Sequence, residues 1–433
     1  MLAAMSASPL TPRSPGAACT RSSGDACPGA LRLHRADDGA LARIRIPGGV
    51  LTPRQAAALG QAAERLGDGE LHLTSRGNVQ VRGLAEDCGA ELAGLLSRAG
   101  LLPSERHERV RNVVASPLSG LDGLGAVDVR PWLTELDQLL CASDRATALS
   151  GRFLFALDDG RGDVDALGAD LTLIGHAGGD ALLRVGEGEA VLRVPGADGP
   201  RAALLAAEAF LDAAEETGAW RTKDLPAAAV TALTGDVVRR FGPAGITCVT
   251  GNRPRPPEAL PPAPGRVPGP PHAAALSVGV PLGRLGPAQW RLLSGAGELR
   301  LTPWRGAVLT GIPPARADDL LAELSGAGLI TGPGSPWTGV GACIGRPGCA
   351  KSLADVRADA GAAVGPAGRL PVYWSGCERR CGHPHGEWID VVVTPGGHRI
   401  SHVRGDRSTE AATVRDDPAA LGAAVAAARD THT

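Results

Sequence analysis

Lysine is nearly absent from this chain of 433 residues, because Lys223 and Lys351 are the only two and arginine supplies the remaining positive charge. Each arginine can hold a carboxylate through two parallel hydrogen bonds, which matters wherever several arginines gather. The formal net charge is only −2, and the sequence has no long basic run. This balance argues against nucleic acid and against a charged membrane surface as partners.

Long apolar stretches are also missing. No run approaches the roughly 18 residues of a membrane-spanning helix, and the start of the chain lacks the charged region and apolar core of a signal peptide. We therefore expect a cytoplasmic protein that does not enter a membrane. Residues 1–30 are rich in Ser, Ala, Pro and Gly, a composition that predicts a disordered tail.

Two pairs of segments recur in the same order along the chain. The segments 46–55 and 280–289 share Pro, Gly, Leu, Pro and Gln at the same spacing, and 69–74 resembles 297–302. Two matches in one order predict an internal duplication. Each copy alternates strands with helices over about 60 residues, which favours a small α+β half-domain. The expected strands are 41–46, 71–73, 275–280 and 299–301, and the expected helices are 53–66, 85–99, 287–294 and 315–327.

The stretch 252–272 separates the two copies. Nine of its 21 residues are proline, so it cannot form a helix or a central strand, and we expect a semi-rigid linker. Weaker echoes join 151–155 to 368–372 and 170–174 to 390–394, and they suggest that two larger units are also copies. The predicted units are a tail at 1–30, half-domains at 31–103 and 273–333, the linker at 252–272, and larger domains at 104–251 and 334–433.

Four of the nine cysteines are paired in sequence. Cys343 and Cys349 form C-x5-C, and Cys377 and Cys381 form C-x3-C. Two short loops that each supply two sulfurs suit a cubane, which needs thiolates converging from different directions. The spacing therefore predicts a [4Fe–4S] cluster. Structural zinc, which prefers C-x2–4-C pairs, and two disulfides, which need an oxidising compartment, are the alternatives.

Polar donors alternate along the segment 73–83. Asn78, Gln80 and Arg82 share one face of an extended strand, and Arg76 joins them if the strand is regular. A row of donors on one face suits a flat ligand that carries several carboxylates. A solvated strand face is the alternative.

On these residues the chain resembles the sulfite and nitrite reductase superfamily, over about residues 31–403. Both cysteine motifs match, the segment 73–83 looks like the family's tetrapyrrole-binding strand, and 111–113 resembles its second arginine motif. The resemblance implies an α+β fold in which duplicated ferredoxin-like half-domains join two iron–sulfur/sirohaem-type α/β domains about a pseudo-twofold axis. It also implies that a tetrapyrrole's carboxylates are held by Arg76, Asn78, Gln80, Arg82, Arg111, Asn112 and Arg152.

One departure from the reductases concerns substrate. Their Lys-x-Lys element corresponds here to Arg152-Phe153-Leu154, so one cation that helps to bind a small oxyanion is lost. Within the superfamily, the segments 27–29, 46–49 and 375–382 are similar to the precorrin-3B synthases of aerobic cobalamin biosynthesis. That likeness implies dioxygen-dependent hydroxylation of precorrin-3A at C20 with γ-lactone formation. A sirohaem-dependent reductase and a non-catalytic electron-transfer protein are the alternative functions.

The same likeness implies a mononuclear non-haem iron beside the [4Fe–4S] cluster, and an electron donor that is a ferredoxin, a flavoprotein or NADH. A facial iron triad uses two histidines and a carboxylate. His383 and His385 follow the last cysteine, with Glu387 and Asp390 nearby, and form the best local candidate. The alternative is that they are polar loop residues. The sequence assigns no catalytic residue.

Overall fold

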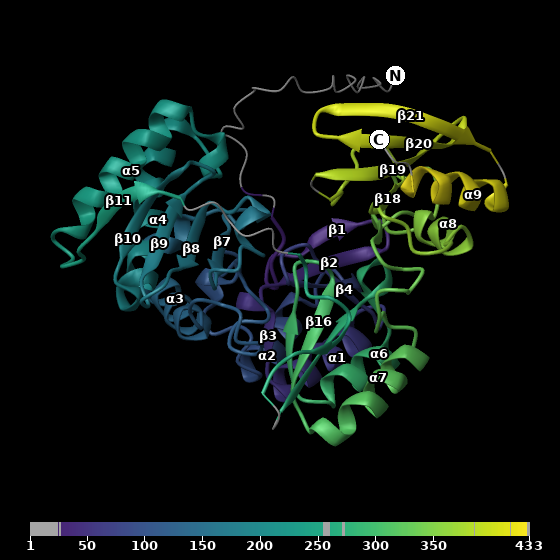
Figure 1. Ribbon diagram of the computed structural model, residues 1–433, viewed down its shortest axis with the longest axis horizontal. Helices are drawn as coiled ribbons and strands as arrows, with labels where there is room; N and C mark the ends of the chain where they lie inside the picture. The colour runs from purple at the N-terminus through teal and green to yellow at the C-terminus, as the bar shows by residue number, and fades with distance from the viewer. Residues whose placement is uncertain are drawn as a thin grey trace, which may run out of the picture.

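The computed structural model describes residues 25, 27–253, 260–270, 273–384, 386–415 and 417–430. Nearly all of the predicted tail, at residues 1–24 and 26, lies outside the described part. Within that part, helices cover four β-sheets, and the predicted α+β class is confirmed. In Figure 1 the six-stranded sheet lies at the left, the C-terminal sheet at the upper right, and the two half-domains below them.

The first half-domain has the strand order β1-β2-β5-β4-β14, and the second has β12-β13-β16-β15-β3. Their helices are α1 (Pro53–Leu66) and α2 (Gly89–Arg98) in the first, and α6 (Pro287–Ser294) and α7 (Ala317–Gly326) in the second. The strands of the first sheet are β1 (His34–Ala36), β2 (Gly39–Ile44), β4 (Leu71–Leu73), β5 (Val79–Leu84) and β14 (Arg284–Leu285). Those of the second are β3 (Val50–Leu51), β12 (Gly265–Val267), β13 (Ala274–Gly279), β15 (Glu298–Leu301) and β16 (Gly306–Ile312).

The two half-domains exchange strands. Strand β14 of the second copy pairs with β4, and β3 of the first copy pairs with β15, both antiparallel. One hydrophobic core runs through both copies. Helices α1 and α6 pack together, and the buried Trp290 indole donates to the carbonyl oxygen of Ala56 at 2.8 Å. The two copies therefore form one folded unit.

Helices α1 and α6 begin and end at the residues predicted from the sequence. Thr52 caps α1 through a reciprocal pair of hydrogen bonds with Gln55, and Pro53 occupies the first helical position. Both features are local, because proline lacks an N–H and the cap satisfies the free N–H groups of the first turn. Strand β12 lies inside the proline-rich stretch, at the edge of its sheet, where proline is tolerated.

The two larger sheets repeat one pattern of strand directions. In the six-stranded sheet β6, β7 and β8 are parallel, and β9 to β11 follow antiparallel. In the C-terminal sheet β17, β18 and β19 are parallel, and β20 and β21 follow antiparallel. This shared pattern is what a second duplication predicts.

The larger N-terminal sheet consists of β6 (Val113–Ala115), β7 (Phe155–Asp158), β8 (Leu171–Gly175), β9 (Ala181–Val185), β10 (Ala190–Val194) and β11 (Val249–Asn252), with helices α3 (Arg130–Ala142), α4 (Gly199–Thr217) and α5 (Ala227–Phe241). The C-terminal sheet consists of β17 (Val340–Ala342), β18 (Val372–Ser375), β19 (Glu387–Thr394), β20 (Gly397–Arg404) and β21 (Arg407–Val414), with α8 (Val356–Ala362) and α9 (Pro418–Arg429).

Candidate functional site

The two cysteine loops meet at one edge of the C-terminal sheet. Cys343 directly follows β17, and Cys377 follows the neighbouring parallel strand β18 after Gly376. Carboxyl ends of parallel strands lie at the same sheet edge, so two motifs far apart in sequence become neighbours. The Gly376 N–H donates to the Cys343 sulfur at 3.3 Å, and the Leu353 N–H donates to the carbonyl oxygen of Gly376 at 2.9 Å.

The residues present fit a cubane cluster. All four cysteines are free of disulfides. Burial raises the pKa of Cys343, and the nearby sulfurs of Cys377 and Cys381 add to the rise. No three of the four sulfurs lie within 4.8 Å of one another. The sulfurs of a tetrahedral zinc site lie closer together than this, because each is about 2.3 Å from the ion, so the four cysteines do not form a closed zinc site here.

A second site is a cavity of about 350 Å³ that is lined by residues of the first half-domain and by Arg152 of the larger N-terminal domain. It contains three of the residues predicted to hold carboxylates: Arg76, Asn78 and Arg152. Its full lining is Cys27, Pro28, Arg43, Thr74, Ser75, Arg76, Asn78 and Arg152. We call it the arginine pocket.

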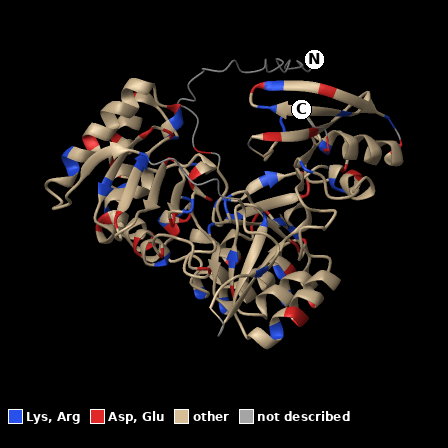
Figure 2. Ribbon diagram, viewed as in Figure 1, with Lys and Arg blue, Asp and Glu red and all other residues tan. Residues whose placement is uncertain are grey.

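The arginine pocket carries positive charge without matching carboxylates. In the described part of the chain, no carboxylate lies within ion-pair distance of Arg43, Arg76 or Arg152. Burial, followed by the neighbouring charges of Arg221, Arg45 and Arg43, lowers the pKa of Arg76 to about 10. An anion in the pocket would relieve this repulsion. Figure 2 shows acidic and basic residues interspersed over the rest of the chain, so the pocket is a local grouping.

Two residues that line the pocket, Cys27 and Arg43, have partners that sequence reasoning missed. The buried Arg45 donates to the Cys27 sulfur at 3.1 Å and to the carbonyl oxygen of Gly151 at 3.0 Å. Arg43 reaches Gln80, whose amide oxygen accepts at 2.7 Å when the amide is oriented for that bond. Arg43 and Arg45 alternate along the segment beside the donor strand, the same period-2 signal that singled out Asn78, Gln80 and Arg82.

Asn78 and Arg111, both predicted carboxylate ligands, have partners within the protein. Asn78 is buried and accepts from the Ile46 N–H at 2.9 Å, and its amide donates to Asn112 at 3.0 Å. Arg111 is buried in a two-bond ion pair with Asp137 and also donates to the carbonyl oxygen of Leu101. These contacts tie the first half-domain and the larger domain together.

Arg82 lies beside the first cysteine loop. It makes two hydrogen bonds of 2.7 Å to Asp38 and donates to the carbonyl oxygen of Gly348 at 3.1 Å. Arg76 leaves the predicted row because residues 74–77 form a turn before β5. The structure thus brings Arg76, Asn78 and Arg152 together with Gln80 close by, and separates Arg82 and Arg111 from them.

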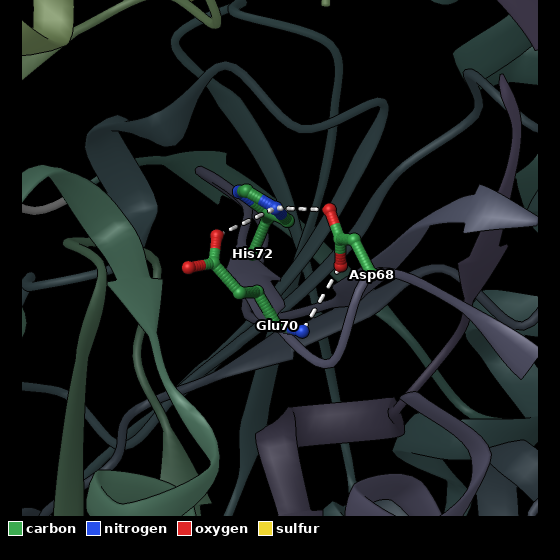
Figure 3. Close-up of side chains that lie close together, drawn as sticks. All are labelled: Asp68, Glu70 and His72. Carbon is green, nitrogen blue, oxygen red and sulfur yellow. Dashed lines mark hydrogen bonds and ion pairs between the residues drawn. The ribbon is translucent and has the colours of Figure 1, made fainter. Parts of the chain in front are cut away.

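The group of Asp68, Glu70 and His72 has three close ligand atoms (Figure 3). The His72 Nε2 is buried without a hydrogen-bond partner and lies 3.9 Å from each carboxylate. However, Arg357 donates to Nδ1 at 3.1 Å, so the ring proton of a neutral His72 sits on Nε2, where a metal would need a lone pair. Both Glu70 oxygens also accept from Arg284. These contacts favour an ion-pair cluster over an iron site.

The structure describes only one of the two histidines that were predicted to bind a second iron. His385 lies outside the described residues. His383 hydrogen-bonds through Nδ1 to the carbonyl oxygen of Pro384 at 2.8 Å, and its ring stacks on Trp388. Among the described residues, His383 belongs to no close group of three His, Cys, Asp or Glu ligand atoms. The mononuclear iron therefore stays a prediction.

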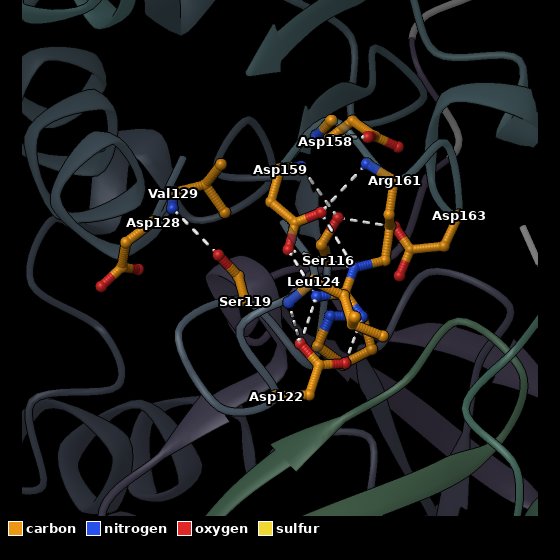
Figure 4. A network of polar contacts seen from close by, with 12 residues as sticks. Ser116, Ser119, Asp122, Leu124, Asp128, Val129, Asp158, Asp159, Arg161 and Asp163 are labelled. Atoms are coloured by element: carbon orange, nitrogen blue, oxygen red, sulfur yellow. Dashed lines mark hydrogen bonds and ion pairs between the residues drawn. The ribbon is translucent and has the colours of Figure 1, made fainter. Parts of the chain in front are cut away.

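An acidic network lies at the corresponding edge of the six-stranded sheet (Figure 4). Asp158, Asp159 and Asp163 are buried with ligand atoms within 4.8 Å of one another. Arg161 forms ion pairs with Asp159 and Asp122, and Ser116 donates to Asp163 at 2.5 Å. Burial raises the pKa of Asp163 to about 7. Arg161 and the raised pKa of Asp163 reduce the negative charge of this network.

Comparisons with known proteins agree with this architecture. The family described as nitrite/sulfite reductase ferredoxin-like half domain matches residues 33–96 and 269–327, which are the two copies. A precorrin-3B synthase from Sinorhizobium is 27% identical over 398 residues, covering 87% of this chain and 82% of that protein. A ferredoxin–nitrite reductase from Synechococcus elongatus is 34% identical over 127 residues, but covers only 28% of this chain and 25% of its own length.

The structure of the Mycobacterium tuberculosis NirA protein superposes with a TM-score of 0.67 at 19% identity, covering 89% of this chain and 79% of its own, which establishes the likeness of fold. Among the described helices, none combines the length and apolar character needed to cross a membrane. The prediction of an oxidoreductase is confirmed by the enzymes that the chain resembles. Two parts of the chain therefore match the nitrite/sulfite reductase ferredoxin-like half domain, and the chain is similar to a precorrin-3B synthase over most of its length.

Proposed function

We propose that this chain is a precorrin-3B synthase-like monooxygenase. Its substrate is a tetrapyrrole of the precorrin-3A type, hydroxylated at C20 with γ-lactone formation in cobalamin biosynthesis. One oxygen atom of dioxygen enters the substrate, and the other leaves as water after taking up two protons and two electrons, the electrons coming from a ferredoxin, flavoprotein or NADH. The observation that carries the proposal is the pairing of an arginine pocket that lacks carboxylates with a four-cysteine site in the same molecule.

The protein's own part in this reaction is binding and orientation. Arg43, Arg76 and Arg152 hold substrate carboxylates through charge-assisted hydrogen bonds. Asn78, fixed by Ile46 and Asn112, sets the position of the pocket wall. Cys343, Cys349, Cys377 and Cys381 hold a [4Fe–4S] cluster, which supplies one-electron transfer when bound. A mononuclear iron for oxygen activation is part of the proposal, without assigned ligands.

The surroundings of Leu154 favour this function over a sulfite or nitrite reductase. The leucine is buried in an apolar cluster with Val114 and Val164, where a lysine ammonium would lose its hydration. The neighbouring Arg152 is exposed and lines the arginine pocket. The site therefore offers no second cation from this stretch for a small oxyanion.

The first test is an absorption spectrum of anaerobically purified protein with iron and sulfide counts. We expect a broad thiolate-to-iron band, no porphyrinoid bands, and one iron atom more than sulfide. A retained macrocycle with sharp Soret and long-wavelength bands would move the assignment to a sirohaem reductase. A cluster without any tetrapyrrole binding would leave only the electron-transfer alternative.

A further inference from the structure

Three arginines hold the backbone of the cysteine loops from three different parts of the molecule. Arg82 of β5 donates to the carbonyl oxygen of Gly348 at 3.1 Å. Arg357, in the first turn of α8, donates to the carbonyl oxygen of Cys343 at 3.2 Å. Arg305, in the turn between β15 and β16, donates to the carbonyl oxygen of Gly382 at 3.2 Å. Each acceptor is a cluster cysteine or its direct neighbour.

Arg357 is a partly buried cation with neutral partners. Its guanidinium donates to the Cys343 carbonyl oxygen and to the His72 Nδ1. In the described part of the chain, no carboxylate lies within ion-pair distance of it, whereas Arg82 is paired with Asp38. Burial lowers the pKa of Arg357 to about 10. Such a charge is costly unless an anion stands nearby.

Arg305 occupies a backbone position that the first copy gives to glycine. Gly77 has φ 65° and Arg305 has φ 57°, and the N–H of each donates to the threonine three residues earlier. A residue with a side chain is strained in this left-handed region, and such strain is typical of functional positions. The Arg305 guanidinium also lies 5.7 Å from the centre of the Tyr373 ring, and the Tyr373 hydroxyl donates to the carbonyl oxygen of Cys381 at 2.6 Å.

We propose that Arg357 and Arg305 are positioning residues that raise the reduction potential of the cluster held by the four cysteines. Reduction adds one negative charge to a group that is already anionic, and nearby cations shielded from water stabilise the reduced form more than the oxidised form. The two arginines contact the cysteine loops, and neither lines the arginine pocket. The inference rests on the proposed function, because it requires the [4Fe–4S] cluster.

The test is an EPR-monitored redox titration of the full chain, with iron and sulfide counts for every variant. Arg357→Gln should retain the cluster and bind the reducing electron at least tenfold more weakly, a downward shift of about 59 mV or more for one electron. Arg357→Lys should lie close to the parent protein, because it keeps the charge. Lys351→Gln is the matched control, since it removes an exposed charge from the same loop, where water and salt screen it.

Arg305→Gly separates the electrostatic role from a structural one. Glycine relieves the backbone strain, so the variant should resist urea at least as well as the parent while its cluster potential falls. A fully loaded Arg357→Gln or Arg305→Gly protein with the parental potential would overturn the inference. A parent protein without cluster iron and sulfide would overturn the proposed function itself.

Discussion

Ser116 and Cys343 occupy equivalent corners in the two halves of the molecule. Each directly follows the first strand of a parallel pair, and each accepts a hydrogen bond from the N–H just after the second strand. The Asp159 N–H donates to the Ser116 hydroxyl oxygen at 3.1 Å, and the Gly376 N–H donates to the Cys343 sulfur at 3.3 Å. The C-terminal domain thus has a thiol at this corner, whereas the six-stranded domain has a hydrogen-bonded acidic network there.

The acidic network predicts a pH dependence of stability. Burial raises the pKa of Asp163 from 3.8 to about 7, so the folded state holds a proton that the unfolded chain has released. The stabilisation is complete below about pH 4 and is lost as the pH rises to about 7. Asp163→Asn mimics the neutral form. Between about pH 5 and pH 8, the free energy of unfolding of this variant, measured with urea, should therefore fall by up to a few kcal/mol less than that of the parent. Glu135→Gln, at an exposed site, should follow the parent curve.

Arg76 and Arg111 should respond differently to removal. Arg76→Ala is expected to weaken binding of a uroporphyrinoid by about 1.5–3 kcal/mol, because it removes a charge-assisted hydrogen bond, with little change in folding stability. Quenching of tryptophan fluorescence reports the binding, since Trp220 lies beside Arg152. Arg54→Ala, on the exposed start of α1, is the control and should bind like the parent.

Arg111→Ala should instead destabilise the fold by about 3–5 kcal/mol, because it leaves the Asp137 carboxylate without its partner. Urea unfolding measures this loss. A variant with parental stability but weak tetrapyrrole binding would contradict the structural role that the ion pair gives Arg111.

The strand exchange predicts that protein stability is sensitive to substitution of Gly49. Gly49 has φ 71°, and a Cβ there would collide with the carbonyl oxygen of Leu301 on the partner strand β15. Gly123 has nearly the same φ of 72° but open space around it. Gly49→Ala should therefore destabilise the protein more than Gly123→Ala, which bears only the conformational strain of about 1–2 kcal/mol. Equal urea midpoints for the two variants would contradict the close approach.

The cluster assignment predicts a clear difference between cysteines. Cys377→Ser should lower the iron and sulfide content and the thiolate-to-iron absorbance, because serine replaces one of four thiolates. Cys248→Ser, in the six-stranded domain, should retain all three signals. Loss of iron in both variants would point to general unfolding, and loss in neither would remove Cys377 from the ligand set.

The sequence by itself determined features whose causes are local. The bounds of α1 and α6 follow from caps, an initial proline and apolar spacing, all within one segment. The duplication and the two cysteine motifs are visible for the same reason, since each depends on residues that are close in sequence. The alternation of Asn78, Gln80 and Arg82 on one strand face is equally local.

Only the tertiary structure decided which of the predicted hydrogen-bond donors remain available to bind a ligand. Asp38 and Asp137 hold Arg82 and Arg111, whereas Arg76 is left in a pocket of like charges. Likewise, no local signal places β3 and β14 in each other's half-domain. Strand pairing and charge compensation depend on groups far apart along the chain, so their partners become known only when the chain has folded.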